Sequence, residues 1–177
     1  MKTILLALLL VFPIFAHAQL TSAQQTTLVT ALKAETNPTL VAALANRNDA
    51  YVLSWCNAAS AVNAWNPAVH FNTLVAAAPL TLYDGLTQGK RDEWRLLGDY
   101  NDPMDMTRQV NRDTIVDAWG TLSRSVPILQ AGVRLATHAE TYFGGTTATT
   151  NTVSALILTH PGTLDQTELS DALNNNP

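Results

Sequence analysis

The segment Gly85-Leu86-Thr87-Gln88-Gly89-Lys90-Arg91 carries the glycines and the lysine of a phosphate-binding loop. A P-loop has four residues between its glycines and a Ser or Thr after the lysine, because that hydroxyl binds magnesium. Here three residues separate the glycines, and Arg91 follows the lysine. The segment therefore predicts a turn, a helix cap at Thr87 and an exposed basic first turn, without a nucleotide site.

Oxygen-bearing side chains crowd into one short loop, at Asp99, Asn101, Asp102 and Asp105. Calcium prefers carboxylate and carbonyl oxygens in flexible loops. An EF-hand loop requires glycine at its sixth position, where this loop has Met104, and proline stands where a ligand belongs. We expect a solvated loop and no metal site.

Three histidines follow residue 18, namely His70, His138 and His160. None belongs to an HExxH motif or to an i, i+4 pair that could chelate zinc from one face of a helix. A single histidine is weak support for a metal or catalytic role. We assign no such role to any of the three.

Cys56 shares a helical face with Val52 and Trp55, which predicts a buried and inert thiol. A reactive thiolate would need a positive environment. The tryptophans lie on different predicted elements, so packing in the core is favoured over an aromatic ligand cage. They are Trp55, Trp65, Trp94 and Trp119.

No constellation in the chain matches a known catalytic motif. The serines lie outside any Gly-x-Ser-x-Gly elbow. The acidic residues are dispersed, so their spacing neither supports nor excludes the paired carboxylates of a glycosidase. We expect no catalytic, cofactor-binding or metal-binding residues, no cofactor, and a protein that is not an enzyme.

Residues 1–18 have the pattern of a secretory signal peptide. Lys2 supplies the positive end, the stretch 4–15 is almost entirely apolar, and Ala16-His17-Ala18 places small residues where a signal peptidase cleaves. We predict cleavage before Gln19. Two alternatives stay open, a buried first helix and an uncleaved membrane anchor, although the apolar run is short for a bilayer of about 30 Å.

Composition bounds the remainder of the chain. The 177 residues are 47% hydrophobic and 14% charged, with 14 acidic against 10 basic residues and one cysteine. This apolar content excludes a disordered chain, and the acidic balance argues against a nucleic-acid binder that neutralises phosphates. A single cysteine excludes an internal disulfide. We expect one domain over residues 19–177, with membrane contact only through residues 1–18 if they remain uncleaved.

Capping residues and apolar periodicity predict a series of short helices. We expect helices over 22–35, after Asn37 and Asn48, over 88–97 with Gly98 as the stop, from Asn111 to Gly120, from Pro127 through Leu135, from Thr137 to Gly144, and after Asp165.

The stretch 153–159 (VSALILT) gives the one convincing strand signal. A lone strand must pair, so we expect a partner near 69–75 or 79–83, or in another subunit. We interpret the Thr-rich stretch 146–152 as a flexible linker. The predicted fold is a mostly α, compact bundle of six to eight short helices with at most one or two short strands.

An ordered set of short motifs runs through residues 20–173. It comprises Leu20-Thr21-x-Ala23-Gln24-x-x-Thr27-Leu28, Asn48-Asp49-Ala50, Trp65, Leu86-Thr87-x-Gly89-Lys90-Arg91-x-x-Trp94, Asn111-Arg112-x-x-Ile115-x-Asp117-Ala118-Trp119-Gly120, Arg134-x-Ala136-Thr137-x-Ala139-Glu140-x-x-Phe143 and Gly162-x-Leu164. This set resembles a family of small virion-associated structural and assembly proteins of long-tailed bacteriophages.

The resemblance implies a non-enzymatic virion component at the head–tail junction or in the tail. It implies contacts with other virion proteins and a homo-oligomer, and it assigns no catalytic or binding residues. Family members begin near the equivalent of Leu20 and lack a signal peptide, so the leader is a departure. A mis-assigned start codon, genuine export and a membrane-active tail each account for it.

Two functions of different classes follow from these observations. The first is the virion component, located in the phage particle and acting through subunit contacts. The second is an exported periplasmic or secreted α-helical binding or inhibitor protein, which the leader favours.

Overall fold

A computed structural model describes residues 19–120 and 122–176. The leader predicted over residues 1–18 lies outside the described residues. Within the described ranges, no helix combines the length and the hydrophobicity needed to cross a bilayer.

The chain has an α/β fold, so the expectation of a mostly α bundle with at most one or two short strands is wrong. About 59% of the described residues are helical and 17% lie in strands. The strands form one four-stranded mixed sheet in the order β2-β1-β4-β3. They are β1 (Ala59–Trp65), β2 (Val133–Thr137), β3 (Gly145–Thr150) and β4 (Val153–Leu158).

The sheet consists of two antiparallel ladders that meet at one point. In the first ladder β1 pairs with β2, with an irregularity in β1 before Asn63. In the second, β3 and β4 form a hairpin. A single parallel-type bridge between Ala64 and Leu156 connects β1 to β4. Trp65 strengthens this connection, because its indole N–H donates to the Ala148 carbonyl of β3 at 3.0 Å.

Helices from both ends of the chain, together with one short helix at residues 138–143, form what we call the terminal body. Leu28 and Leu32 of the first helix are fully buried at i, i+4 spacing and pack with Leu40, Val52 and Leu169 of the other helices. The helices are α1 (Ser22–Ala34), α2 (Pro38–Ala45), α3 (Asp49–Asn57), α8 (His138–Phe143) and α9 (Gln166–Asn175).

Residues 66–132 form the distal body, which is inserted between β1 and β2. The Asn66 N–H donates to the Gly132 carbonyl at 3.0 Å, so the chain enters and leaves this body at one neck. Its core contains Trp94, Trp119 and Ile128. The helices are α4 (Phe71–Ala77), the 3-10 helix η1 (Leu80–Gly85), α5 (Gln88–Tyr100), α6 (Gln109–Trp119) and α7 (Leu122–Ala131).

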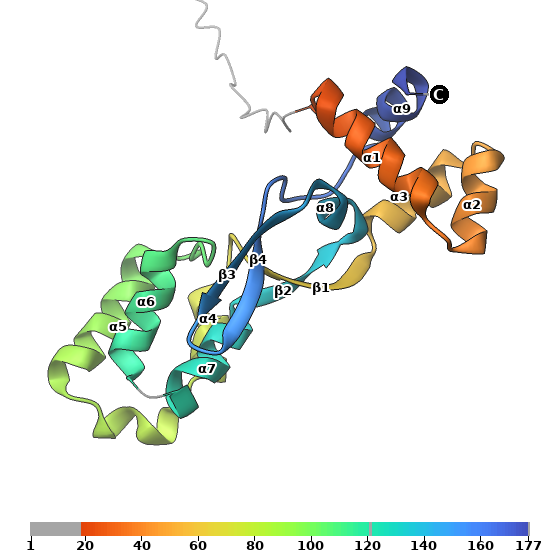
Figure 1. The fold of residues 1–177 in the computed structure, drawn as a ribbon. Coiled ribbons are helices and arrows are strands. Elements are labelled where there is room, and N and C mark those ends of the chain that lie inside the picture. Colours follow the sequence, from red (N-terminus) through yellow and green to blue (C-terminus); the bar gives the residue numbers. More distant parts are fainter. Residues whose placement is uncertain (1–18, 121, 177) are drawn as a thin grey trace, which may run out of the picture.

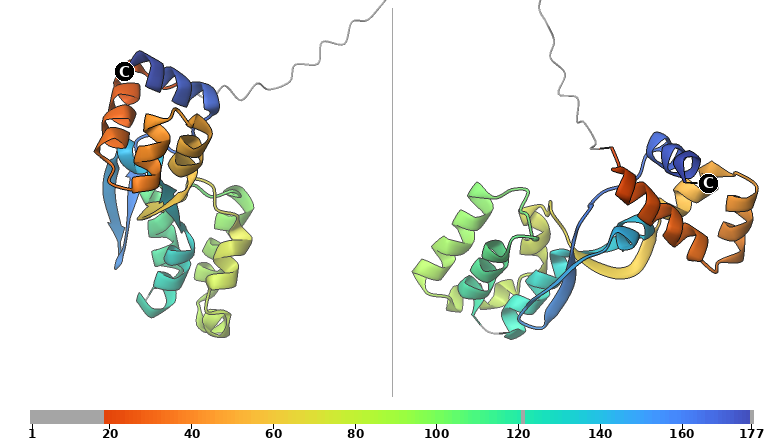
Figure 2. Two further views of the ribbon diagram at one scale, coloured as in Figure 1. Left: turned by 90° about the vertical axis from the view of Figure 1, so that its right-hand side faces the viewer. Right: turned by 45° about the horizontal axis from the view of Figure 1, so that its top comes forward.

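The two bodies lie at opposite ends of the sheet (Figures 1 and 2). At one end α1 and α9 pack side by side, although they come from opposite ends of the chain. At the other end the distal body covers the tip of the β3–β4 hairpin, where Val153 and Ala155 join its core. The sheet therefore acts as the connection between two separately packed sets of helices.

Most of the helix caps that the sequence predicts are confirmed, the exception being Asn111, which lies inside α6. Full capping boxes begin α1, α8 and α9 at Thr21, Thr137 and Asp165. In each, the cap side chain accepts the N3 amide while the N3 side chain accepts the cap amide, which pairs two otherwise orphan N–H groups. Asn37 and Asn48 cap α2 and α3, as expected.

Several predicted helix limits are wrong. Helix α5 continues past Gly98 to Tyr100, and α6 begins at Gln109 with Asn111 inside it. Pro127 lies inside α7 instead of opening it. The residues after Gly132 form β2 and not a helical continuation, because their backbone pairs with β1 in an antiparallel ladder.

The expected flexible linker over 146–152 and the expected strand partners are also wrong. The predicted strand at 153–159 exists as β4, but its neighbours are β3, built from the Thr-rich stretch, and β1. Stretches 69–75 and 79–83 contain helical residues of α4 and η1 instead. Threonine is β-branched and favours strands, which explains why the Thr-rich stretch is ordered.

Candidate functional site

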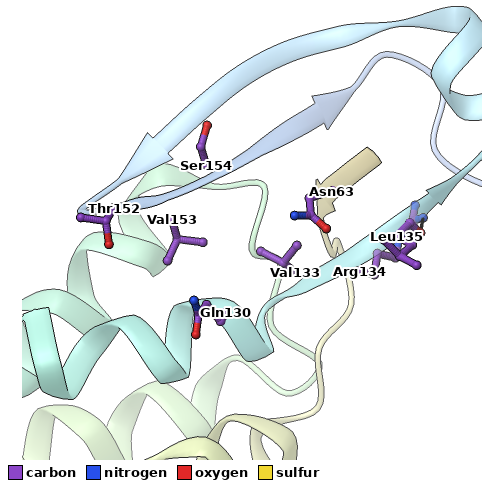
Figure 3. A pocket seen from close by; sticks show the side chains of 8 residues that line it. All are labelled: Asn63, Gln130, Val133, Arg134, Leu135, Thr152, Val153 and Ser154. Carbon is purple, nitrogen blue, oxygen red and sulfur yellow. Dashed lines mark hydrogen bonds between the residues drawn. The ribbon is translucent and has the colours of Figure 1, made fainter. Parts of the chain in front are cut away.

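A groove of about 460 Å3 opens beside the sheet, between β2 and the beginning of β4 (Figure 3). Amide and hydroxyl groups surround apolar side chains in its wall. The lining residues are Asn63, Gln130, Val133, Arg134, Leu135, Thr152, Val153 and Ser154. These residues include no carboxylate, histidine or cysteine, so Ser154 has no base among them and the groove offers hydrogen bonding to a neutral polar ligand.

Arg134, the one charged residue of the groove, is held by Glu140. Its guanidinium makes two contacts with that carboxylate, at 2.8 and 2.6 Å. The same carboxylate accepts the N–H groups of Thr137 at 2.8 Å and of Gly162 at 2.6 Å. Glu140 is only 1% exposed, and the cluster joins β2, α8 and the segment that leads to α9.

These contacts set the charge state of Glu140. Burial by itself raises the pKa of a carboxyl group. The guanidinium of Arg134 and the two N–H donors outweigh burial and hold the pKa of Glu140 below its usual value. Glu140 is therefore an ionised structural carboxylate with its lone pairs engaged.

The outer edge of β3 is the second candidate site. The Thr159 N–H donates to the Gly144 carbonyl at 3.1 Å. Hydrogen-bonded pairs recur at every second residue, so the register makes Thr146, Ala148 and Thr150 the residues of β3 that bond to β4. In an antiparallel ladder, hydrogen-bonded residues alternate with residues whose N–H and C=O groups point away from the partner. The backbone groups of Gly145, Thr147 and Thr149 therefore point to the outside of the sheet.

No hydrogen bond from another described segment reaches these outward groups. Gly145, Thr147 and Thr149 are exposed, and β3 (GTTATT) contains no charged residue and no proline. Native proteins usually protect such edges with charges, prolines, bulges or a covering element. The β3 edge carries none of these protections between Gly145 and Thr149, and at its end Gln109 of α6 donates to the Thr150 hydroxyl at 3.3 Å.

Gly145 fixes where this edge begins. A Cβ atom on Gly145 would lie 2.4 Å from the Ile157 carbonyl oxygen of β4. Only glycine permits so close an approach of the two strands. The hairpin is thus pinned at this residue, directly after α8.

The three histidines His70, His138 and His160 lie apart from one another in the fold. His70 lies 3.1 Å from the Asp102 carboxylate on the surface, and His138 stacks on Trp55. His160 meets the ring of Phe143 edge-on. Within residues 19–120 and 122–176, no group of three or more His, Cys, Asp or Glu side chains could hold a metal ion.

The acidic loop uses its carboxylates locally. Asp102 accepts the N–H of Phe71 at 3.1 Å, at the beginning of α4. Asp105 accepts the backbone N–H and the hydroxyl of Thr107 at 2.9 and 2.6 Å. Asp99 belongs to α5.

The segment resembling a phosphate loop is a turn followed by a helix, as predicted. Thr87 caps α5, and the Lys90 ammonium lies 2.9 Å from Glu93 and 3.3 Å from Asp117. The prediction of a buried thiol is also confirmed, since Cys56 is fully buried and burial raises its pKa to about 12.

Arg112, which no sequence motif marked as a candidate, is only 1% exposed. Its guanidinium donates to the Met106 and Thr107 carbonyls at 2.6 and 2.8 Å and to the Thr150 hydroxyl at 2.9 Å, and it lies over the Trp65 ring at 4.8 Å. This cation ties α6 to the hairpin and the sheet through neutral acceptors.

The β3 edge was missed as well. A signal for it exists in the β-branched run that precedes Asn151, the usual composition of a strand before a hairpin turn.

Comparison with known protein families, curated proteins and solved structures finds no match to this chain.

Proposed function

We propose that this chain is a non-enzymatic structural or assembly protein of a tailed-phage virion, at the head–tail junction or in the tail. It acts through contacts between subunits, as the ordered motifs along residues 20–173 imply by resemblance. The proposal assigns no reaction and no cofactor to the chain.

The open edge of β3 is the observation that carries the proposal. An extended segment that adds to a sheet edge gains main-chain hydrogen bonds, which is a common mode of protein recognition. The outward groups of Gly145, Thr147 and Thr149 offer such bonds, and the strand lacks the charges that discourage pairing. An edge of this kind fits a surface that another protein segment covers in an assembly.

A second candidate is an exported binding protein, and the groove beside β2 favours it. Its uncharged amides and hydroxyls around Val133 and Val153 suit a small neutral polar ligand. The predicted leader over residues 1–18 supplies the matching route out of the cell.

Mass spectrometry of purified phage particles, together with N-terminal sequencing of the chain, separates the two candidates. We expect the chain in particles at a fixed ratio to the other structural proteins. A chain that begins at Gln19 in the periplasm and is absent from particles would refute the virion role and support the exported binding protein.

A further inference from the structure

We infer that the partner of the β3 edge is the β3 strand of a second copy of this chain. The two strands would run antiparallel about a two-fold axis at Thr147. Thr147 then faces its own equivalent, and Gly145 faces Thr149 of the other copy. The inference rests on the proposed role in subunit contacts and names the partner.

The backbone register of β3 is self-complementary. Gly145, Thr147 and Thr149 each present one outward N–H and one outward C=O group. With Thr147 on the axis, every outward N–H meets an outward C=O of the other copy, because hydrogen-bonded pairs recur at every second residue. Three N–H groups from each copy thus give six intermolecular hydrogen bonds.

Side chains on the same strand permit this pairing. Thr147 and Thr149 are β-branched, and directly opposed threonines favour antiparallel pairs. Gly145 opposite Thr149 leaves room for that side chain. The strand has no charge, so two copies bring no like charges together, although the whole chain has a net charge of −4.

The extent of the shared ladder is also set by the structure. At one end, β3 ends at Thr150, whose backbone pairs with Val153 of β4, so the outward groups available for pairing lie within residues 145–149. At the other end, Gly144 has φ +74 and ends α8, directly before β3 begins. The pairing joins the two sheets into one eight-stranded sheet, with β3 and its equivalent at the centre.

A test uses the full chain with charges placed on the two-fold axis. Sedimentation should give twice the chain mass of 19.1 kDa for the unchanged protein. Thr147→Lys and Thr147→Glu each place like charges directly opposite, so each alone should weaken dimerisation by up to about fivefold. Mixing the two variants should restore the dimer, because Lys then faces Glu. Thr147→Val keeps the backbone and shape and serves as the matched control that stays dimeric.

Hydrogen exchange gives a second readout that does not depend on a variant folding well. The Thr147 and Thr149 amides should gain protection as protein concentration rises, whereas Thr146 and Ala148, which bond to β4, should be protected at all concentrations. An unchanged chain that stays monomeric without this protection would overturn the inference. Charge variants that each dimerise as tightly as the unchanged chain, or a mixture that dimerises no better than either variant alone, would also overturn it.

Failure of this inference is distinct from failure of the proposed function. A chain that is monomeric alone but present in particles, and lost from them when Thr147 is changed to Lys, excludes a second copy as the partner and keeps the virion role. Absence from particles removes the virion role and leaves the dimer measurement unaffected.

Discussion

The two outer strands of the sheet, β2 and β3, differ in how their outward backbone groups are hydrogen-bonded. The Asn66–Gly132 hydrogen bond sets the alternation in β2, so the Leu135 carbonyl points outward. The Arg134 guanidinium donates to this carbonyl at 3.1 Å while Glu140 holds it in place. The corresponding outward groups of β3 have neither a charged neighbour on the strand nor a bond from another described segment.

A sheet edge is therefore closed by a few specific contacts. Both strands are short, and both lie at the edge of the same sheet. Only β2 contains a charged residue, and that residue is fixed by a buried carboxylate with four hydrogen-bond donors around it. Removing or weakening the contacts on each edge should therefore have unequal effects.

Glu140→Ala removes the group that holds the β2 edge and should have the largest effect. Arg134, Thr137 and Gly162 would each lose a hydrogen-bond acceptor in a buried region. Loss of one partner of a buried ion pair lowers the free energy of unfolding by about 3–5 kcal/mol. Urea denaturation measures it, with Glu93→Ala as a control at the more exposed Lys90–Glu93 pair, where we expect a much smaller loss. Equal losses in both variants would contradict the role of Glu140.

Gly145→Ala tests how firmly the open strand β3 is held against β4. The added Cβ would lie 2.4 Å from the Ile157 carbonyl oxygen, so the strands must separate. We expect a loss of about 1–3 kcal/mol in the free energy of unfolding. Gly89→Ala, where nothing lies within 4 Å, is the matched control and should be neutral or stabilising. A stable Gly145→Ala variant with an unchanged hairpin would show that this contact does not pin the edge.

Acid should destabilise the contacts at the β2 edge, because it protonates Glu140. Its pKa is lower in the folded chain than the ordinary value of 4.5, so the unfolded chain takes up the proton first. The stabilisation is complete above that ordinary value and is lost as the pH falls through the lower, folded pKa. Denaturation curves measured from neutral to acidic pH should show this loss, and Glu140→Gln should flatten it. An identical acid dependence in Glu140→Gln would exclude Glu140 as its source.

Thr149→Ala should have the smallest effect. The Thr149 hydroxyl donates to the Ser154 hydroxyl at 3.1 Å on the exposed face of the hairpin. A solvent-exposed hydrogen bond of this kind contributes less than about 1 kcal/mol. A double-mutant cycle with Ser154→Ala isolates the coupling between the two side chains. A coupling above that value would mean that the open edge has an internal support not apparent from its contacts.

Local sequence signals predicted the helix starts well where a capping side chain is present, because caps are local chemistry, whereas the starts predicted at Asn111 and Pro127 are wrong. Thr21, Thr137 and Asp165 each pair with a Gln or Glu three residues later, and all three boxes form. Helix ends depend more on tertiary contacts. A Cβ on Gly98 would lie 2.4 Å from the Phe71 ring, so this glycine lets Phe71 pack closely against α5 and does not end the helix.

The sheet was hard to predict because its pairings are long-range. Strand β1 pairs with β2, which lies beyond the whole distal body in sequence, and β1 contains alanine, serine and asparagine instead of a strong apolar alternation. Strand β3 could have been recognised from its threonines, but composition alone also fits a linker. The groove and the Arg134–Glu140 cluster depend on these pairings and could not be assembled from spacing.

The neck at Asn66 and Gly132 has an evolutionary consequence. Because the chain crosses into residues 66–132 and back at one hydrogen-bonded pair, this whole segment could be acquired or deleted in a single genetic event without rethreading the remainder. A tight Asn-Gly turn in its place would convert β1 and β2 into an ordinary hairpin. The excised form would expose Trp65, Val153 and Ala155 of the sheet, so these positions would require polar replacements in a minimal version of the molecule.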